Sequence, residues 1–217
     1  MSTSKTLDKI YKQLYSAFGP RNWWPGETPF EVVIGAILTQ NTNWTNVEKA
    51  IHNLKEAKEL TSKKLYEIDT SELAEHIRPS GYFNIKAKRI KNFINWLFKN
   101  YDGDLSKMFE QELPELRESL LSVNGIGPET ADSILLYGGN KLTFVVDAYT
   151  HRIFKRHNLI SEESTYDEIK IFFEENIPAD VSLYNEFHAL IVKLGSEYCK
   201  PKKRCEKCPL NLFLSDV

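Results

Sequence analysis

The chain has 217 residues, of which 41% are hydrophobic and 12% aromatic, enough for one compact unit or two small packed domains. Its 28 Lys and Arg against 30 Asp and Glu give a formal net charge of -2, which excludes the overall basic character typical of nucleic-acid binders. No run approaches the roughly 20 apolar residues of a membrane span, and no signal-peptide pattern is visible. We therefore expect a soluble, cytoplasmic protein in which any affinity for nucleic acid comes from local basic patches.

The apolar spacing is helical almost everywhere and predicts an all-α fold. Capping boxes are predicted at residues 28–31, with Pro29 in the first helical position, and at residues 165–168. Besides an N-terminal helix, the predicted helices in chain order are 30–38, 44–54, 71–77, 85–100, 114–121, 128–137, 147–156, 165–175 and 182–198. No segment alternates with a period of two residues over a plausible strand, and the chain has no internal repeat.

A glycine-rich turn joins the helices predicted at 114–121 and 128–137, and in it Gly125 and Gly127 bracket one apolar residue. Glycine allows left-handed backbone angles and a close approach to a partner. The free amides at the start of the next helix favour an anion, so such a turn suits a DNA phosphate held without reading sequence. The alternative is an ordinary connection between two helices, because short glycine motifs are weak indicators.

Further segments make the pattern specific, and they occur in a fixed order: Leu38–Thr42, Pro79–Lys88, Val123–Ala131 and Val145–Arg152. They resemble the helix-hairpin-helix and aspartate loop of the endonuclease III superfamily of DNA glycosylases, and the resemblance extends from about Trp23 to Pro209. It implies two helical domains: a six-helix barrel at 22–141 that holds the hairpin, and a second domain made of 1–21 and 142–217. A base flipped out of double-stranded DNA would enter the cleft between them.

By this resemblance Asp147 is the catalytic carboxylate. An ionised Asp can stabilise the cationic sugar as the glycosidic bond breaks, and it can orient a water molecule. The structural alternative is a helix N-cap, and both roles can hold together. Family members that also cleave the strand carry a Lys on the helix after the hairpin, where this sequence has Glu129. Because a carboxylate cannot form an imine, the resemblance implies a monofunctional enzyme that uses water.

Aromatic residues near the first barrel helices predict a base pocket formed by Trp23, Trp24, Pro25 and Trp44. Indole faces stack on a flipped base and attract a cationic one, as in the 3-methyladenine branch of the superfamily. The alternative is core packing, and we expect at least one of these Trp residues to be structural.

Other residues are predicted to contact DNA. Gln40 and Tyr82 match the intercalating positions of the family, with a surface turn and core packing as their respective alternatives. The hairpin contributes Gly125, Gly127 and Thr130. Two basic clusters flank the matched motifs and are expected to follow phosphates: Lys86, Lys88, Arg89 and Lys91, and then His151, Arg152, Lys155 and Arg156.

All three cysteines, Cys199, Cys205 and Cys208, lie in one basic loop that resembles the iron-sulfur loop of endonuclease III. A [4Fe-4S] cluster normally takes four thiolates, but the fourth position is Leu214, so the Cys set is incomplete. The alternatives are a cluster completed by a residue such as Asp216, a three-iron form, a relic loop with free thiols, or zinc with three Cys and one oxygen ligand.

Together these features predict a monofunctional DNA glycosylase of base excision repair that removes alkylated, 3-methyladenine-like purines. Three alternatives remain: a bifunctional glycosylase and lyase, a mismatch glycosylase, and a non-catalytic helix-hairpin-helix module. We expect a monomer that binds double-stranded DNA containing a damaged base, and no membrane.

Overall fold

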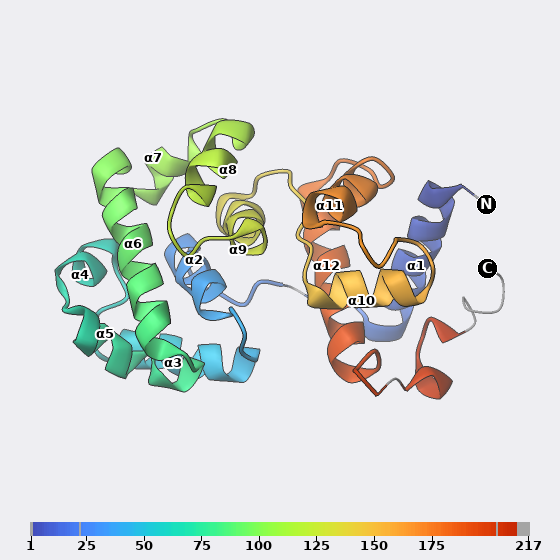
Figure 1. The fold of residues 1–217 in the computed structure, drawn as a ribbon, viewed down its shortest axis with the longest axis horizontal. Coiled ribbons are helices and arrows are strands. Elements are labelled where there is room, and N and C mark those ends of the chain that lie inside the picture. Colours follow the sequence, from blue (N-terminus) through green and yellow to red (C-terminus); the bar gives the residue numbers. More distant parts are fainter. Residues whose placement is uncertain (1, 22, 203, 212–217) are drawn as a thin grey trace. The chain divides into compact units, whose positions relative to one another are not determined.

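The structure is a computed structural model that describes residues 2–21, 23–202 and 204–211. Within these ranges every regular element is helical, so the predicted all-α fold class is confirmed (Figure 1). The chain forms two compact units, Pro25–Lys141 and Met1–Trp24 with Leu142–Val217. We call them the hairpin unit and the aspartate unit, and we describe each by itself.

The hairpin unit is built around α2 (Pro29–Leu38), in which every residue from Glu31 to Leu38 is buried. The other elements of the unit are α3 (Trp44–Glu56), α4 (Ser62–Glu67), α5 (Thr70–His76), η1 (Arg78–Ser80), α6 (Phe83–Tyr101), α7 (Leu105–Phe109), α8 (Leu113–Leu121), α9 (Pro128–Ser133) and the π-helical turn η2 (Ile134–Gly138). The long helix α6 packs on α2 and also on α4, α5, α7 and η1.

Short polar side chains start several of these helices, as their sequence context predicts. The Thr28 hydroxyl accepts the Glu31 amide hydrogen at 3.2 Å, but the Glu31 carboxylate accepts from the amide of Glu27 rather than from that of Thr28. The capping box predicted at residues 28–31 is therefore only half formed. Sequence periodicity missed α4 and α7, because helices of five or six residues are too short to show a repeating apolar face.

The aspartate unit contains α1 (Thr3–Phe18), α10 (Ala148–Arg156), α11 (Tyr166–Glu174), α12 (Val181–Glu197) and the short η3 (Cys205–Lys207). Helix α12 packs against α1 and α10. Phe144 and Phe173 stack with ring centroids 4.1 Å apart, and Phe187 meets Phe173 edge-on at 5.7 Å. The capping box predicted at residues 165–168 is confirmed in full, with both reciprocal hydrogen bonds present.

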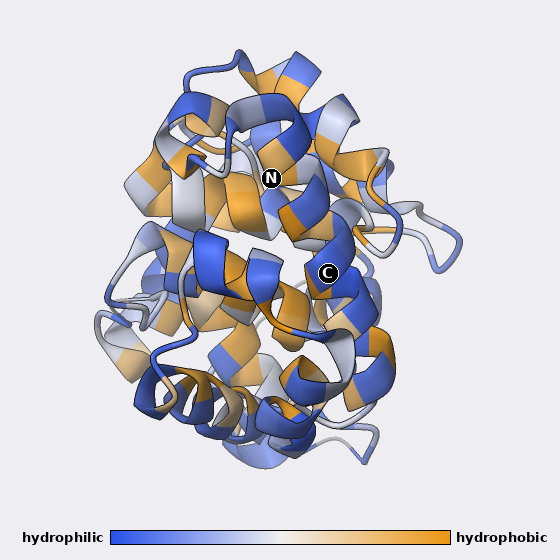
Figure 2. Cartoon of the chain, turned by 90° about the vertical axis from the view of Figure 1, so that its left-hand side faces the viewer, coloured by the Kyte–Doolittle hydropathy of each residue, from blue (hydrophilic) through white to orange (hydrophobic). Residues whose placement is uncertain are grey.

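Each unit has its own apolar core. Hydrophobic and hydrophilic residues alternate along the helices (Figure 2), which is the pattern of helices that bury one face and expose the other. In the described part of the chain no helix is long and apolar enough to cross a membrane.

Candidate active site and nucleic-acid interface

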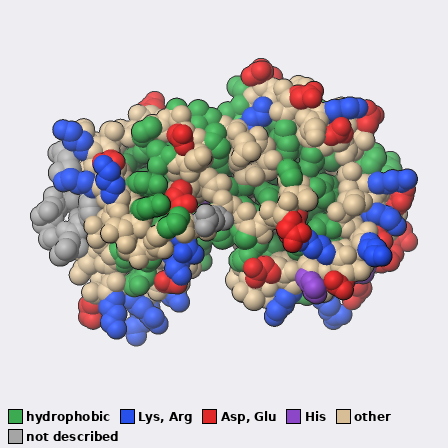
Figure 3. Space-filling view, turned by 180° about the vertical axis from the view of Figure 1, so that it is seen from behind, with side chains coloured by type: hydrophobic (Ala, Val, Ile, Leu, Met, Phe, Trp, Pro, Cys, Tyr) green, Lys and Arg blue, Asp and Glu red, His purple; other side chains and the backbone are tan. Residues whose placement is uncertain are grey.

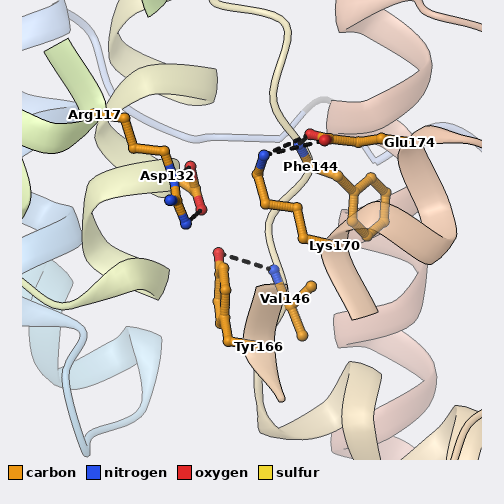
Figure 4. Close-up of polar contacts among 7 residues, drawn as sticks. All are labelled: Arg117, Asp132, Phe144, Val146, Tyr166, Lys170 and Glu174. Atoms are coloured by element: carbon orange, nitrogen blue, oxygen red, sulfur yellow. Dashed lines mark hydrogen bonds and ion pairs between the residues drawn. The ribbon is translucent and has the colours of Figure 1, made fainter. Parts of the chain in front are cut away.

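A buried ion pair holds the two helices of the hairpin together. Arg117 of α8 and Asp132 of α9 meet in a two-pronged contact, Nε to Oδ1 at 2.9 Å and Nη2 to Oδ2 at 3.1 Å (Figure 4). The Asp132 side chain has no exposed surface. Because the fork of an Arg matches a carboxylate in one plane, this pair fixes the angle between the helices as well as their separation.

The turn between these helices has the shape that the sequence predicts. Gly125 has a φ of +98°, and a Cβ added there would lie 2.3 Å from Cγ of Arg89. Both the backbone angle and the packing therefore require glycine. Gly127 is different: its φ is -95°, it is exposed, and an added Cβ would meet nothing within 4 Å. The fold itself does not need glycine at position 127.

Gln40 lies in the turn after α2 and bonds to the hairpin. Its Nε2 donates to the Gly125 carbonyl at 3.1 Å and to the Thr130 hydroxyl at 2.8 Å. Its Oε1 accepts a hydrogen bond from Arg89 of α6. The structure thus brings together three of the predicted DNA-contact residues, Gln40, Gly125 and Thr130, although Gln40 is far from the other two in the sequence.

Two of the four residues in the first basic cluster bond to backbone carbonyls. Lys86 is 1% exposed, and its ammonium donates to the carbonyls of Leu38 at 2.8 Å and Ser80 at 2.6 Å. Burial, together with repulsion from Arg89, lowers the pKa of Lys86 to about 8. The prediction that Lys86 contacts DNA is wrong in this structure, because its ammonium is enclosed. Lys91 is likewise committed to carbonyls at the end of α4, whereas Lys88 is exposed.

The turn before α6 presents an apolar tip to solvent. Tyr82 is the N-cap residue of α6, has a left-handed backbone with φ of 47°, and is 69% exposed. Ile85, one turn further on, is 51% exposed. Core packing, the structural alternative for Tyr82, does not apply, because a core tyrosine would be buried.

Asp147 is the N-cap residue of α10, and its carboxylate is fixed on one side. Oδ1 accepts from the Thr150 amide at 2.7 Å and from the Thr150 hydroxyl at 2.8 Å. The preceding strand-like segment is buried and pinned at two points, where Phe144 N–H donates to Glu174 at 2.8 Å and Val146 N–H to the Tyr166 hydroxyl at 3.4 Å (Figure 4). The backbone that delivers Asp147 is therefore held rigidly.

The second carboxylate oxygen of Asp147 faces a buried histidine that sequence reasoning missed. Nε2 of His188, on α12, lies 3.9 Å from Oδ2 of Asp147, and His188 is 5% exposed. Burial lowers the pKa of His188, while the charge of Asp147 acts in the opposite direction. Burial is the larger effect, so the neutral imidazole is favoured at pH 7. In the sequence His188 is one polar residue in an apolar helix, which more often marks a core position.

The predicted pocket residues divide between the two units. Pro25 and Trp44 of the hairpin unit line one cavity of about 130 Å³. The indole N–H of Trp44 donates to Glu48 at 2.7 Å, which orients the ring. The remaining lining residues are Glu31, Glu48, Ile51, His52 and Lys55. Trp23 and Trp24 belong to the aspartate unit, are half-buried, and pack edge-on with centroids 5.2 Å apart.

Arginines of α10 hold the start of the cysteine loop. Arg152 donates from Nε to the Cys199 carbonyl at 2.7 Å, and Arg156 donates to the Cys199 sulfur at 3.2 Å and the Lys200 carbonyl at 2.8 Å. These two residues are therefore engaged within the protein, whereas the sequence predicts that they follow phosphates.

In the described part of the cysteine loop the structure shows no group of residues that holds a metal ion, so the iron-sulfur cluster stays a prediction. Cys199, Cys205 and Cys208 are free thiols, and no three His, Cys, Asp or Glu residues in the described ranges are grouped to hold a metal ion. Burial raises the pKa of Cys208, and the neighbouring Cys199 and Cys205 add to that rise. Leu214 and Asp216, named as fourth-ligand positions, lie outside the described residues.

Comparisons with known proteins agree with this architecture. Residues 34–179 match the family described as HhH-GPD superfamily base excision DNA repair protein. A protein of Methanocaldococcus jannaschii whose name assigns it to the DNA repair glycosylases is 50% identical over 94% of each chain. The 3-methyladenine DNA glycosylase of H. pylori, solved with 1,N6-ethenoadenine, is 34% identical with a TM-score of 0.78, covering 91% of this chain and 98% of that one. An endonuclease III in a non-covalent DNA complex shares the fold, with 23% identity, a TM-score of 0.82, and 98% and 95% coverage.

The chain belongs to the HhH-GPD superfamily of base excision DNA repair proteins, and it is a DNA N-glycosylase. The resemblance to the endonuclease III superfamily, stated from the four sequence segments, is thereby confirmed.

Proposed function

We propose that this glycosylase is monofunctional: it releases an alkylated, 3-methyladenine-like purine from duplex DNA by hydrolysis and leaves the strand intact. The observation that carries the proposal is Glu129, which stands in the second position of α9 where the strand-cleaving members of the family have lysine. Glu129 is exposed, so the position is accessible to a substrate but offers no amine.

In this proposal Asp147 performs the catalytic step. Thr150 holds one carboxylate oxygen, which leaves the other for the cationic sugar or for a water molecule. A carboxylate fixed beforehand stabilises developing positive charge without reorganising during the reaction. The neutral imidazole favoured at His188 adds no opposing positive charge beside it.

Trp44 and Pro25 offer a flat apolar wall, with the Glu48 carboxylate bonded to the indole N–H. An indole face attracts a cation, and the hydrogen bond to a carboxylate makes the ring more electron-rich. A cationic methylated purine gains from both effects, and its positive charge already weakens the glycosidic bond. The 34% identity with an enzyme named for 3-methyladenine supports the same substrate class.

DNA would be held at three places in the hairpin unit. The exposed Gly127 at the start of α9 lets a phosphate approach the helix amides, and Lys88 supplies a positive charge. Tyr82, with Ile85 beside it, presents an apolar tip that can wedge between bases. Gln40 is predicted to intercalate, and in the free protein its side chain bonds to the hairpin.

The test is a set of duplexes that each carry one lesion, scored separately for base release and for strand cleavage. We expect methylated purines to be released without strand cleavage, and no covalent adduct after borohydride treatment. A trapped adduct would support the bifunctional alternative. Faster release of mismatched adenine, thymine or uracil would favour the mismatch alternative, and binding without release would leave a non-catalytic module.

A further inference from the structure

Helix α6 connects segments of the hairpin unit that are distant in the sequence. Its polar side chains bond to carbonyls and side chains of other segments rather than facing only solvent. Lys86 bonds the carbonyls at Leu38 and Ser80, and Asn92 bonds the carbonyl of Asn124 in the hairpin turn at 3.0 Å. The hairpin turn, the turn after α2 and the turn before α6 are therefore all attached to one rigid helix.

Arg89 and Gln40 form the central link in this arrangement. A side-chain amide has one oxygen acceptor and one nitrogen that can donate twice. In Gln40 both groups are engaged, since the oxygen accepts from Arg89 and the nitrogen donates to Gly125 and Thr130. Moving Gln40 into a DNA stack would break all three contacts, and it would leave the guanidinium and the Gly125 carbonyl to find new partners.

Packing reinforces the same link. The Arg89 stem lies so close to Gly125 that a Cβ there would be 2.3 Å from Cγ, 3.0 Å from Cδ and 3.1 Å from Cβ of Arg89. Arg89 thus contacts the hairpin directly through its stem and indirectly through Gln40. The shape of the turn depends on both residues. The stem of Arg89 packs against Gly125, and Gln40 bonds a carbonyl and a hydroxyl of the hairpin.

We propose that Gln40 and Arg89 are positioning residues that hold the hairpin turn in its phosphate-binding shape before DNA arrives. The inference rests on the proposed function in so far as the ligand of the hairpin is duplex DNA.

The experiment compares Gln40→Ala, Arg89→Met and the double variant in the full-length protein. Hydrogen exchange of the amides at residues 124–131 is measured without DNA, and affinity is measured on an undamaged duplex over a range of salt concentrations. Single-turnover base release is measured with enzyme in excess. Lys99→Met is the matched control, since it removes an exposed positive charge from the same helix away from the hairpin.

We expect each single variant to speed hairpin exchange and to weaken binding by about tenfold, equally for damaged and undamaged duplexes. The double variant should be no weaker than the weaker single one, because both act on the same turn. The loss should appear mainly in affinity and less in the release rate at saturation, because neither side chain touches Asp147. The slope of the logarithm of affinity against the logarithm of salt concentration should be unchanged. Residues that only hold the turn do not contact phosphates and release no counterions. Arg89→Lys should restore part of the affinity by keeping a donor for Gln40.

Three results would overturn the inference. A salt slope reduced by about one in Arg89→Met would make Arg89 a phosphate contact. Unchanged hairpin exchange in Gln40→Ala would show that Gln40 does not hold the turn. Additive losses in the double variant would separate the two residues. If Arg89→Met does not fold, the exchange of Gln40→Ala decides alone. Failure of the proposed function would appear separately, as no base release by the wild-type protein on any lesion.

Discussion

At the scale of single residues, Asp147 is the N-cap residue of α10 and also the catalytic carboxylate that we propose, two roles that the sequence could not separate. Its Oδ1 caps α10 through Thr150, and its Oδ2 points past that cap toward His188. The same carboxylate therefore starts a helix with one oxygen, and its other oxygen takes no part in that cap. A cap role alone would be met equally well by asparagine, and this difference makes the catalytic role testable.

We predict that Asp147→Asn keeps the fold and the affinity for DNA but lowers the rate of base release by about 10²–10⁴-fold, because the amide carries no negative charge. Thr150→Val is the matched variant: it keeps the charge and the backbone contact but removes the hydroxyl that holds Oδ1. It should reduce release much less. Single-turnover release with enzyme in excess measures both, with thermal unfolding as the check on folding. Release by Asp147→Asn at the wild-type rate would refute the catalytic role.

At this scale the sequence predicts residues that lie within short motifs, but not contacts between residues that are distant in the chain. The hairpin glycines and Asp147 lie in short motifs, and the motifs identify them. The burial of Lys86 was readable too, since Lys86, Ile90, Ile94 and Leu97 share one helical stripe, but the run of positive charges suggested a solvated face. The contact of Arg89 with Gln40 joins residues 49 positions apart, and no local pattern reports it.

At the scale of elements, the hairpin depends on one buried charge pair. Asp132 has no exposed surface, and Arg117 is its partner across the two helices. Removing one partner of a buried pair takes away a large part of what offsets the desolvation of the other charge. The same change also removes the contact that sets the angle between α8 and α9. The shape of the hairpin turn depends on that angle.

We predict that Arg117→Met lowers the free energy of unfolding by about 3–5 kcal/mol. Replacing both residues, with Arg117→Met and Asp132→Asn together, should cost less than that single change because no charge is left buried. Urea unfolding of the three proteins measures the difference. A double variant that is less stable than Arg117→Met would contradict this account of the pair.

Helix α6 leads to a prediction about pH, because Lys86 has a pKa of about 8 in the folded protein against an ordinary value of 10.5. Between these two values the unfolded chain binds more protons than the folded one, so stability rises with pH in that window. Compared with Lys86→Met, the wild-type protein should gain up to roughly 3 kcal/mol between pH 8 and 10.5. Below pH 8 the difference between the two proteins should be constant.

Urea unfolding of both proteins at intervals from pH 7 to 10.5 tests this, and other titrations cancel in the difference between them. Lys88→Met provides the control, since Lys88 is an exposed neighbour on the same helix. A difference between wild type and Lys86→Met that stays flat above pH 8 would show that the ammonium keeps its ordinary pKa despite its burial.

At the scale of the whole molecule, a net charge of -2 means that DNA affinity must arise locally. On the face drawn in Figure 3, Lys and Arg side chains are interspersed with Asp and Glu rather than gathered in one basic surface. Several basic residues of the predicted clusters also turn inward: Lys86 and Arg152 bond carbonyls, and Arg156 bonds the cysteine loop. Composition therefore gives the small net charge. Only the structure shows which basic side chains are already bonded within the protein.

We expect Trp44 to determine which lesions the enzyme removes. We predict that Trp44→Ala slows excision of positively charged methylated purines, because it removes about 1–3 kcal/mol of stacking between the base and the ring. It should affect neutral bases such as hypoxanthine less, because these gain no cation–π attraction from the indole. Trp44→Phe keeps a flat ring and gives up the hydrogen bond to Glu48, so it should fall between the wild type and Trp44→Ala.

A second variant separates the effect of the ring from that of the carboxylate bonded to its N–H. Glu48→Gln can still accept the indole N–H but carries no negative charge, so it should reduce the preference for charged lesions while leaving neutral ones unchanged. Competition between charged and neutral lesions in the same flanking sequence measures all four proteins together. Equal losses on both kinds of lesion in Trp44→Ala would mean that Trp44 supports the fold of the unit rather than the base. A wild-type protein that prefers the neutral lesion would remove the physical basis for assigning it alkylated purines.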